Sequence, residues 1–244
     1  MTDPTGPTDI EFRSEMTVEL VKSSASDADV VFAARVSTKG EASLDDVEAD
    51  ASGASGLINY LMRDRHGSPF EHNSLTYFVS APIFVFREFM RHRIASYNEE
   101  SGRYRELRPV FYVPGPDRNL VQQGKPGAYE FVPGTPAQHD LVDSLVRESC
   151  TQAYAAYQQM LAAGVAREVA RVVLPVTTYS SMYVTMNARA LMNFLSLRTK
   201  RDNSRNPSYP QREIEMVADA MEVEWAALMP LTHAAFESHG RVAP

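Results

Sequence analysis

The sequence predicts an α+β protein with a mixed or antiparallel sheet, long helices and a helix-rich C-terminal half. Alternation of apolar and polar residues over 16–22, and β-branched and aromatic runs at 75–80 and 177–186, indicate strands. Longer amphipathic runs with helical spacing dominate from residue 137 onward. Strand signals therefore come early and in the middle, while helices fill the second half, which is typical of the α+β class.

We expect a flexible N-terminal tail over residues 1–14, followed by a single domain over residues 15–244. The tail contains two prolines, one glycine and few apolar residues. A hydrophobic content of 44% with 23% charged residues is that of a soluble globular protein. The sequence has no apolar run of about eighteen residues and no basic, apolar leader, so we expect a cytoplasmic protein.

Before residue 66 the pattern predicts two helices joined by an acidic connection. Ser26 is suited to cap the first helix, over 26–36, because its hydroxyl can accept a hydrogen bond from a backbone amide of the first turn. Residues 38–55 form the connection, and 56–65 has helical periodicity. A His-Gly-Ser-Pro turn then ends the second helix.

A third helix is predicted immediately after the strand at 75–80. Pro82 fits its first position, where the missing N–H of proline is not needed. Met90 follows earlier apolar positions at helical spacing, so we expect it to face inward. Arg87 and Arg91 would share another face of this helix and could grip one phosphate.

The middle of the chain is predicted to be a long loop, and the second half a series of helices. Residues 109–136 contain six prolines and four glycines, which leaves room only for short strands at 110–113 and 129–132. A polar surface loop is expected at 199–210. Asn187 is the expected cap of the third of these helices, which run over 137–163, 165–174, 187–198, 211–228 and 230–239.

Charge and cysteine content exclude several classes of function. The net charge is −7, yet there are 20 arginines against 4 lysines, which favours small anionic ligands over general binding of nucleic acid. The one cysteine, Cys150, excludes an internal disulfide and a multi-cysteine metal site, and we expect no metal. Cys150 is interpreted as a small core-facing side chain of its helix rather than as a nucleophile.

The segment 87–108 has an unusual composition. It contains six arginines and four glutamates but no lysine, and it directly follows an apolar run. Guanidinium groups suit phosphates and flat rings rich in acceptors, and the serines, asparagine and glutamates of the segment add acceptors. The composition fits a nucleotide or flavin site, although the same charges could pair with one another on an exposed helix.

Residues 91–104, RHRIASYNEESGRY, match every specified position of R-H-R-x-x-S-x-N-E-x-S-x-R-Y, the signature of the flavin-dependent thymidylate synthases. Three more blocks resemble this family in the same order: HGSPFEH, GVAREVARVVLP and NARALMNFLSLR. The resemblance runs from about residue 18 to residue 236. It implies a homotetramer with active sites at subunit interfaces. It also implies methylation of dUMP to dTMP, with bound FAD, 5,10-methylenetetrahydrofolate as carbon donor and NADPH as hydride source.

The resemblance also implies roles for individual residues. Arg198 is the expected catalytic residue, because it would face the uracil, where a fixed cation favours loss of the ring imide proton. The residues implied at FAD are His66, Ser68, Arg91, His92, Arg93, Glu99, Asn187, Arg189 and Asn193. Those implied at dUMP are Glu88, Phe89, Met90, Arg91, Glu99, Glu100, Ser101, Gly102, Arg103, Arg171 and Arg198.

Several of these positions also have a purely structural interpretation. Arg171 could form a surface ion pair with Glu168, which contributes little to stability. His72 could be a core histidine, and the helix at 187–198 could be merely structural.

The sequence also departs from the family at a few places and leaves other functions open. Glu88 stands where many relatives have glutamine, and the loops at 114–136 and 199–210 differ from the common pattern. One alternative is a flavin reductase or oxidase that binds a nucleotide without methyl transfer. Another is a nucleotide-binding or RNA-binding module without flavin.

Overall fold

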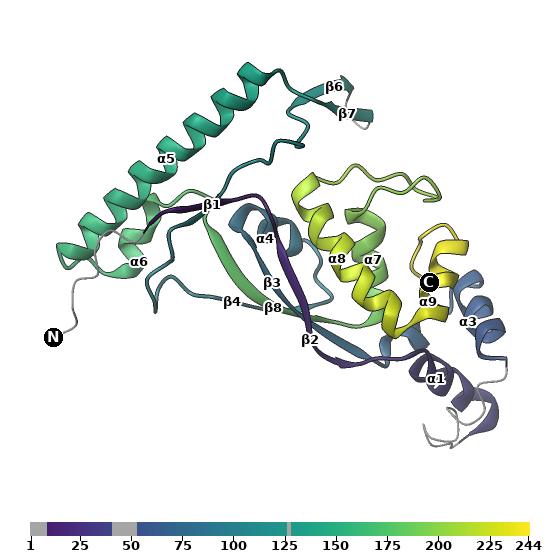
Figure 1. Ribbon diagram of the computed structural model, residues 1–244. Helices are drawn as coiled ribbons and strands as arrows, with labels where there is room; N and C mark the ends of the chain where they lie inside the picture. Colours follow the sequence, from purple (N-terminus) through teal and green to yellow (C-terminus); the bar gives the residue numbers. More distant parts are fainter. Residues whose placement is uncertain (1–8, 41–52, 126–127) are drawn as a thin grey trace. The chain divides into compact units, whose positions relative to one another are not determined.

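The computed structural model describes residues 9–40, 53–125 and 128–244, which divide into two compact units (Figure 1). The described residues of unit 1 are 9–15, 80–89, 99–125 and 128–181. Those of unit 2 are 16–40, 53–79, 90–98 and 182–244. Helices and strands are both present in quantity, so the predicted α+β class is confirmed. A single domain over residues 15–244 stays a prediction.

The larger sheet has four strands in the order β2-β3-β8-β4. The strands predicted from alternation and β-propensity are confirmed, since each of those stretches forms one of them. β3 and β8 each contribute residues to both units. Their bounds are β2 (Thr17–Ser24), β3 (Ser74–Pro82), β8 (Tyr179–Met186) and β4 (Ser96–Glu99).

Unit 1 is organised around the long helix α5 (Pro136–Ala162) (Figure 1). Its buried Cys150 and Tyr154 pack in one cluster with Phe111. Gly164, at φ 81°, follows the end of the helix, where a left-handed conformation favours a residue without Cβ. The long helix, its glycine stop and the core position of Cys150 are therefore confirmed.

Shorter elements complete unit 1. β1 pairs with β5 in parallel, and β6 pairs with β7 in an antiparallel hairpin. The bounds are β1 (Glu11–Arg13), α4 (Ile83–Phe89), β5 (Val110–Tyr112), β6 (Val121–Lys125), β7 (Ala128–Val132), α6 (Arg167–Ala170) and the 3-10 helix η2 (Arg171–Val173).

Three of these short elements differ from the prediction. β1 lies in the stretch expected to be a flexible tail, whose residues 1–8 are outside the described part of the chain. β6 was not predicted because its sequence, VQQGK, is polar, and its pairing with β7 supplies the order that burial would otherwise give. The helix predicted at 165–174 is only the short α6 followed by η2, so its full length was wrong.

In unit 2 the indole of Trp225, on α8, is buried against α9, and Figure 1 shows both helices. The ring of Phe236 meets this indole at a centroid distance of 5.8 Å. Ser26 caps the first helix, as predicted, and the carboxylate of Asp27 accepts hydrogen bonds from two backbone amides at the start of α9. The bounds are α1 (Asp27–Lys39), α3 (Ala54–Arg63), the 3-10 helix η1 (Ser68–Glu71), α7 (Ala188–Arg198), α8 (Arg212–Leu228) and α9 (Pro230–Ser238).

Helix α4 is shorter than predicted at both ends. Pro82 is the last residue of β3 rather than the first of the helix. The helix ends at Phe89, where the chain passes from unit 1 to unit 2. The inward orientation predicted for Met90 is therefore wrong, since this side chain is 45% exposed. Arg91 lies beyond the end of α4, so the helix face predicted to be shared by Arg87 and Arg91 is wrong, while their contact with a phosphate stays a prediction.

Two findings remain, one on the acidic connection and one on the helices. Of the acidic connection predicted at 38–55, residues 41–52 are outside the described part, and α1 and α3 flank it. Within the described ranges, each helix is too short or too polar to cross a lipid bilayer.

Candidate functional site

The residues expected at the ligands fall into two groups, one in each unit. The members in unit 1 are Glu88, Phe89, Glu99, Glu100, Ser101, Gly102, Arg103 and Arg171. The members in unit 2 are His66, Ser68, Met90, Arg91, His92, Arg93, Asn187, Arg189, Asn193 and Arg198.

In unit 1 a tight turn presents the side chain of Arg103. The hydroxyl of Ser101 accepts a hydrogen bond from the backbone N–H of Arg103 at 3.3 Å. Gly102 is buried inside the turn, and a Cβ there would lie 2.9 Å from Cδ1 of Leu107 and 3.3 Å from Cδ of Arg171. The absence of a side chain at residue 102 thus allows Arg171 to lie close to the backbone of the turn.

The two arginines of this turn differ in their partners. Nε of Arg103 lies 2.8 Å from a carboxylate oxygen of Glu168, and both side chains are about half exposed, at 54% and 53%. Arg171 is half-buried at the start of η2, and its charge acts on the carboxylate of Glu99. An ion pair between Arg171 and Glu168, the structural interpretation from the sequence, is wrong because Glu168 pairs with Arg103.

The neighbouring carboxylates Glu99 and Glu100 are in different environments. The side chain of Glu100 is only 11% exposed, lies 3.1 Å from Nε of Arg105 and accepts a hydrogen bond from the hydroxyl of Ser181 at 3.1 Å. Glu99 is more exposed, yet desolvation raises the pKa of its carboxyl, partly opposed by a hydrogen bond with Ser180. Glu99 is therefore the more open acceptor, whereas Glu100 is held by protein groups.

In unit 2 the His-Gly-Ser-Pro turn lies against the first turn of α7. A Cβ at Gly67 would lie 2.5 Å from Cζ of Arg189, so a side chain there would displace this guanidinium from its present position. The guanidinium of Arg189 is in turn held by the carboxylate of Glu71 at 2.5 Å and by the backbone oxygen of Pro244 at 2.6 Å. Two blocks that the sequence linked only by resemblance are thus in contact.

Asn187 begins α7 in the predicted way. Its side-chain oxygen accepts a hydrogen bond from the backbone N–H of Ala190 at 2.9 Å. The side-chain oxygen of Asn73 accepts a second one from the N–H of Ala188, at 2.7 Å. Since capping engages the oxygen of Asn187, its amide NH2 group is the part that can donate to a ligand.

The remaining polar residues of this group are open to solvent. The side chains of Arg91, Arg93 and Asn193 are exposed and form no hydrogen bond or ion pair with the described residues of unit 2. His66 and Ser68, on either side of the glycine of the turn, are also exposed. This set offers strong cationic donors together with hydroxyl, amide and imidazole groups, which fits an anionic ligand with a flat, polar ring.

Arg198, the last residue of α7, donates its Nε–H to Nε2 of His92 at 3.0 Å. The His92 ring meets the ring of Phe194 edge to face, with centroids 4.9 Å apart. The hydroxyl of Tyr97 donates to the backbone oxygen of His92 at 2.7 Å. Burial, followed by the positive charge of Arg198, lowers the pKa of His92 to about 4, so this imidazole is neutral at neutral pH.

A cavity of about 400 Å³ lies beside Arg198, lined by the last turn of α7, by residues 206–210 and by residues 241–242. The hydroxyl of Ser208 donates a hydrogen bond to the backbone oxygen of Leu197 at 2.6 Å, which holds residues 206–210 against the helix. The sequence predicted only a surface loop there. Its one available signal was the pair of prolines within 206–210, which restricts the loop.

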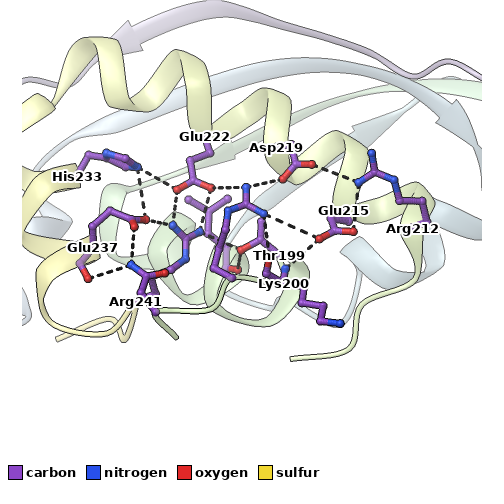
Figure 2. A network of polar contacts seen from close by, with 12 residues as sticks. Thr199, Lys200, Arg212, Glu215, Asp219, Glu222, His233, Glu237 and Arg241 are labelled. Carbon is purple, nitrogen blue, oxygen red and sulfur yellow. Dashed lines mark hydrogen bonds and ion pairs between the residues drawn. The ribbon is translucent and has the colours of Figure 1, made fainter. Parts of the chain in front are cut away.

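A network of charges stabilises unit 2 just beyond α7 (Figure 2). Arg241 is 1% exposed, pairs with Glu222 at 2.6 Å and with Glu237, and donates to the hydroxyl of Thr199 at 2.9 Å. Although burial alone would raise it, the pKa of Glu222 is lowered to about 2 by hydrogen bonds with His233 and Arg241 and by nearby positive charge. These contacts fasten the chain that follows Arg198 to α8 and α9.

Two other features of the described residues have structural explanations. Glu222, His233 and Glu237 bring possible metal-ligand atoms within 4.8 Å of one another, but Arg241 already pairs with both carboxylates. Cys150 is buried, its sulfur lies 3.3 Å from the hydroxyl oxygen of Thr177, and burial raises the pKa of its thiol. A thiol of this kind is a poor nucleophile.

The sequence matches the family model described as thymidylate synthase complementing protein over residues 19–231. It is 70% identical over 246 residues to the flavin-dependent thymidylate synthase of Streptomyces coelicolor, with 100% of both chains covered. It is 43% identical over 219 residues to that of Thermotoga neapolitana, which covers 90% of this chain and 89% of the relative.

The fold is similar to that of the UMP/dUMP methylase PolB from Streptomyces cacaoi. The structure bound with 5-Br UMP has a TM-score of 0.89 and 56% identity, and covers 97% of this chain and 100% of PolB. The structure bound with 5-Br dUMP has a TM-score of 0.90 and 57% identity, with 96% and 100% covered. Both comparisons extend over nearly the whole chain.

Proposed function

Because the chain belongs to the flavin-dependent thymidylate synthase family, we propose that this enzyme methylates dUMP to dTMP with the help of bound FAD. The proposal includes 5,10-methylenetetrahydrofolate as carbon donor, NADPH as hydride source, and a cytoplasmic homotetramer with active sites at subunit interfaces. Its strongest support is the 57% identity, over 96% of the chain, to a methylase solved with 5-Br dUMP.

The substrate dUMP requires donors for its phosphate and partners for its polar ring. In unit 1, Arg103 and Arg171 supply guanidinium groups beside the turn at Gly102, and the Ser101 side chain is part of the same turn. Glu99 supplies an acceptor whose raised pKa makes its protonation state sensitive to a bound partner. This combination supports the binding of a nucleotide monophosphate by the turn.

The polar set of unit 2 fits FAD. Arg91 and Arg93 provide cationic donors for a pyrophosphate, while Ser68 and Asn193 provide neutral groups for the edge of a flat ring. The close approach at Gly67 brings the turn at 66–69 next to α7, which carries Asn193. When bound, the flavin supplies hydride-transfer chemistry, and the protein supplies its orientation.

Methylation of uracil requires an electron-rich ring, and two features of this chain bear on how the ring is activated. Addition of a cysteine thiolate is one route, but Cys150 is buried and the pKa of its thiol is raised. The alternative is a fixed positive charge that stabilises the ring after loss of its imide proton. We assign this role to Arg198, which is among the residues that line a cavity of about 400 Å³.

The test replaces Arg198 by alanine or lysine. Loss of the planar fork of donors should lower dTMP formation about 100-fold, the effect of removing one group that stabilises developing charge. FAD binding, followed by absorbance, should be retained. The matched control is Arg63→Lys, an exposed arginine paired with Asp64, and it should leave turnover unchanged. Unchanged turnover in Arg198→Ala would remove Arg198 from the reaction.

The same assay separates this proposal from its competitors. UMP is a second candidate substrate because the similar solved proteins are UMP/dUMP methylases, so tritium release from dUMP and from UMP should be compared. Consumption of NADPH without methylated product would indicate a flavin reductase or oxidase. Colourless protein after saturation with FAD would indicate a nucleotide-binding module.

A further inference from the structure

His92 contacts Arg198 in a way that its place in the arginine-rich signature does not explain. Nε2 of His92 accepts the Nε–H of Arg198 at 3.0 Å, across 106 residues of sequence. The same ring packs edge to face on Phe194, four residues before Arg198 on α7. Tyr97 holds the backbone of His92 from the other side of the segment, through a hydrogen bond of 2.7 Å.

The direction of this hydrogen bond fixes the chemical state of the ring. An arginine Nε can only donate, so Nε2 of His92 must offer a lone pair. The imidazole is then neutral, with its proton on Nδ1. Burial and the charge of Arg198 lower the pKa of His92 to about 4, so the ring stays an acceptor throughout the physiological range. A neutral ring brings no positive charge to a phosphate.

The bond also restricts the guanidinium. A free arginine side chain samples many rotamers. Its guanidinium is planar and includes Nε–H, so a hydrogen bond donated by Nε–H constrains the orientation of that plane. Holding Nε–H on a packed imidazole therefore fixes both the place and the plane of the group. Since Arg198 lines the cavity at the end of α7, the orientation of its guanidinium decides how a ring bound there meets its positive charge.

We propose that His92 is a positioning residue that orients the guanidinium of Arg198 by accepting its Nε–H. This inference rests on the proposed function, in which Arg198 faces the uracil ring. It gives His92 a role in turnover of the nucleotide, beyond the role at FAD that the family resemblance implies. The expected signature is a lower kcat for methylation without loss of bound flavin.

Two substitutions separate positioning from packing. His92→Phe keeps a ring that can pack on Phe194 but has no acceptor, and kcat for dTMP formation should fall about 10- to 100-fold, as misplacement of a catalytic group by about 1 Å does. His92→Gln places an acceptor oxygen near the position of Nε2 and should recover most of this loss. FAD affinity and the KM for dUMP should change less than kcat. His139→Phe on α5 is the matched control.

The outcomes that overturn the inference are distinct from failure of the proposed function. Full kcat in His92→Phe, equal losses in both variants, or loss of FAD with normal turnover per bound flavin would each contradict it. A second readout does not depend on activity. In nitrogen NMR spectra of the full chain with FAD, His92 should be the neutral Nδ1–H form at pH 7.

The NMR measurement can also be made on a variant that lacks the guanidinium of Arg198. In Arg198→Met the pKa of His92 should rise from about 4 toward the ordinary value, because one cause of its lowering is removed. A protonated His92 at pH 7 in the unsubstituted protein, or a pKa that Arg198→Met does not move, would contradict the contact. If the contact is confirmed but no dTMP forms from dUMP, the proposed function fails instead.

Discussion

Arginines in unit 2 occupy two opposite environments, and the difference separates scaffold from ligand site. Arg241 is 1% exposed and is matched by Glu222 and Glu237 (Figure 2). Arg91 and Arg93 are exposed and have no ion pair with the described residues of their unit. A buried cation needs compensation to be tolerated, so Arg241 cannot also serve an anionic ligand. The exposed pair needs none and stays available for one.

Arg198 combines features of both environments. It is partly buried at the end of α7, and one of its donors is held by the imidazole of His92. A hydrogen bond donated to a neutral ring orients a guanidinium, whereas a carboxylate acceptor would also oppose its charge. Burial and ion pairing thus make Arg241 part of the fold, whereas exposure leaves Arg91 and Arg93 open to a ligand.

The largest expected effect comes from breaking the buried network. Arg241→Met removes the buried guanidinium that pairs with both Glu222 and Glu237 and should lower the free energy of unfolding by about 3–5 kcal/mol. Thermal and urea unfolding of FAD-free protein would measure it. The control, Arg212→Met, removes a guanidinium from the same network whose side chain is 49% exposed, and should cost under about 1 kcal/mol. Equal losses would erase the proposed difference between buried and exposed arginines.

A smaller effect is expected from acid. The pKa of folded His92 is about 4, below the ordinary 6.5, so between these values the unfolded chain binds more protons. Stability that is present above pH 6.5 should therefore be lost as the pH falls toward 4, by roughly 2–3 kcal/mol. The contribution of Glu222, with a pKa of about 2 against 4.5, should be lost only at lower pH.

Urea unfolding at several pH values would separate the two windows. His92→Phe should remove the loss between pH 6.5 and 4 and leave the loss below pH 4.5 in place. An unchanged loss in the upper window would assign it to other groups.

The smallest effect is expected at the exposed ion pair of unit 1. Arg103 and Glu168 are 54% and 53% exposed, so Glu168→Gln should change the free energy of unfolding by under about 1 kcal/mol. Affinity for dUMP, measured by calorimetry, should stay the same or increase slightly, because the guanidinium of Arg103 is released. A destabilisation above about 2 kcal/mol would place this pair with the buried network instead.

Local signals predicted much of the fold because neighbours in sequence determine them. Ser26 and Asn187 cap their helices through bonds to amides three residues ahead, and Gly164 follows the end of α5. The end of α4 was missed because it depends on where the chain passes between units. β6 was missed because a polar strand is ordered by its hairpin partner rather than by burial.

The contacts of the candidate site could not be predicted from local sequence either. The resemblance identified Arg198 and His92 separately, but no spacing rule predicts a hydrogen bond across 106 residues. The same holds for Arg241 and Thr199, 42 residues apart, whose bond secures the end of α7. Composition cannot distinguish a held carboxylate such as Glu100 from an open one, because that difference arises only when the segments pack.

Helix α7 has a consequence for how such an enzyme can change. Its 11 residues separate Asn187 from Arg198 by about 16 Å along a rigid rod. One inserted residue would advance the far end by about 1.5 Å and swing it by about 100° around the axis. A substitution at either end leaves this spacing intact, whereas an insertion or deletion between the ends changes both their distance and their relative direction. In the proposed function, the length of α7 therefore sets the spacing between the group at FAD and the group at the uracil ring.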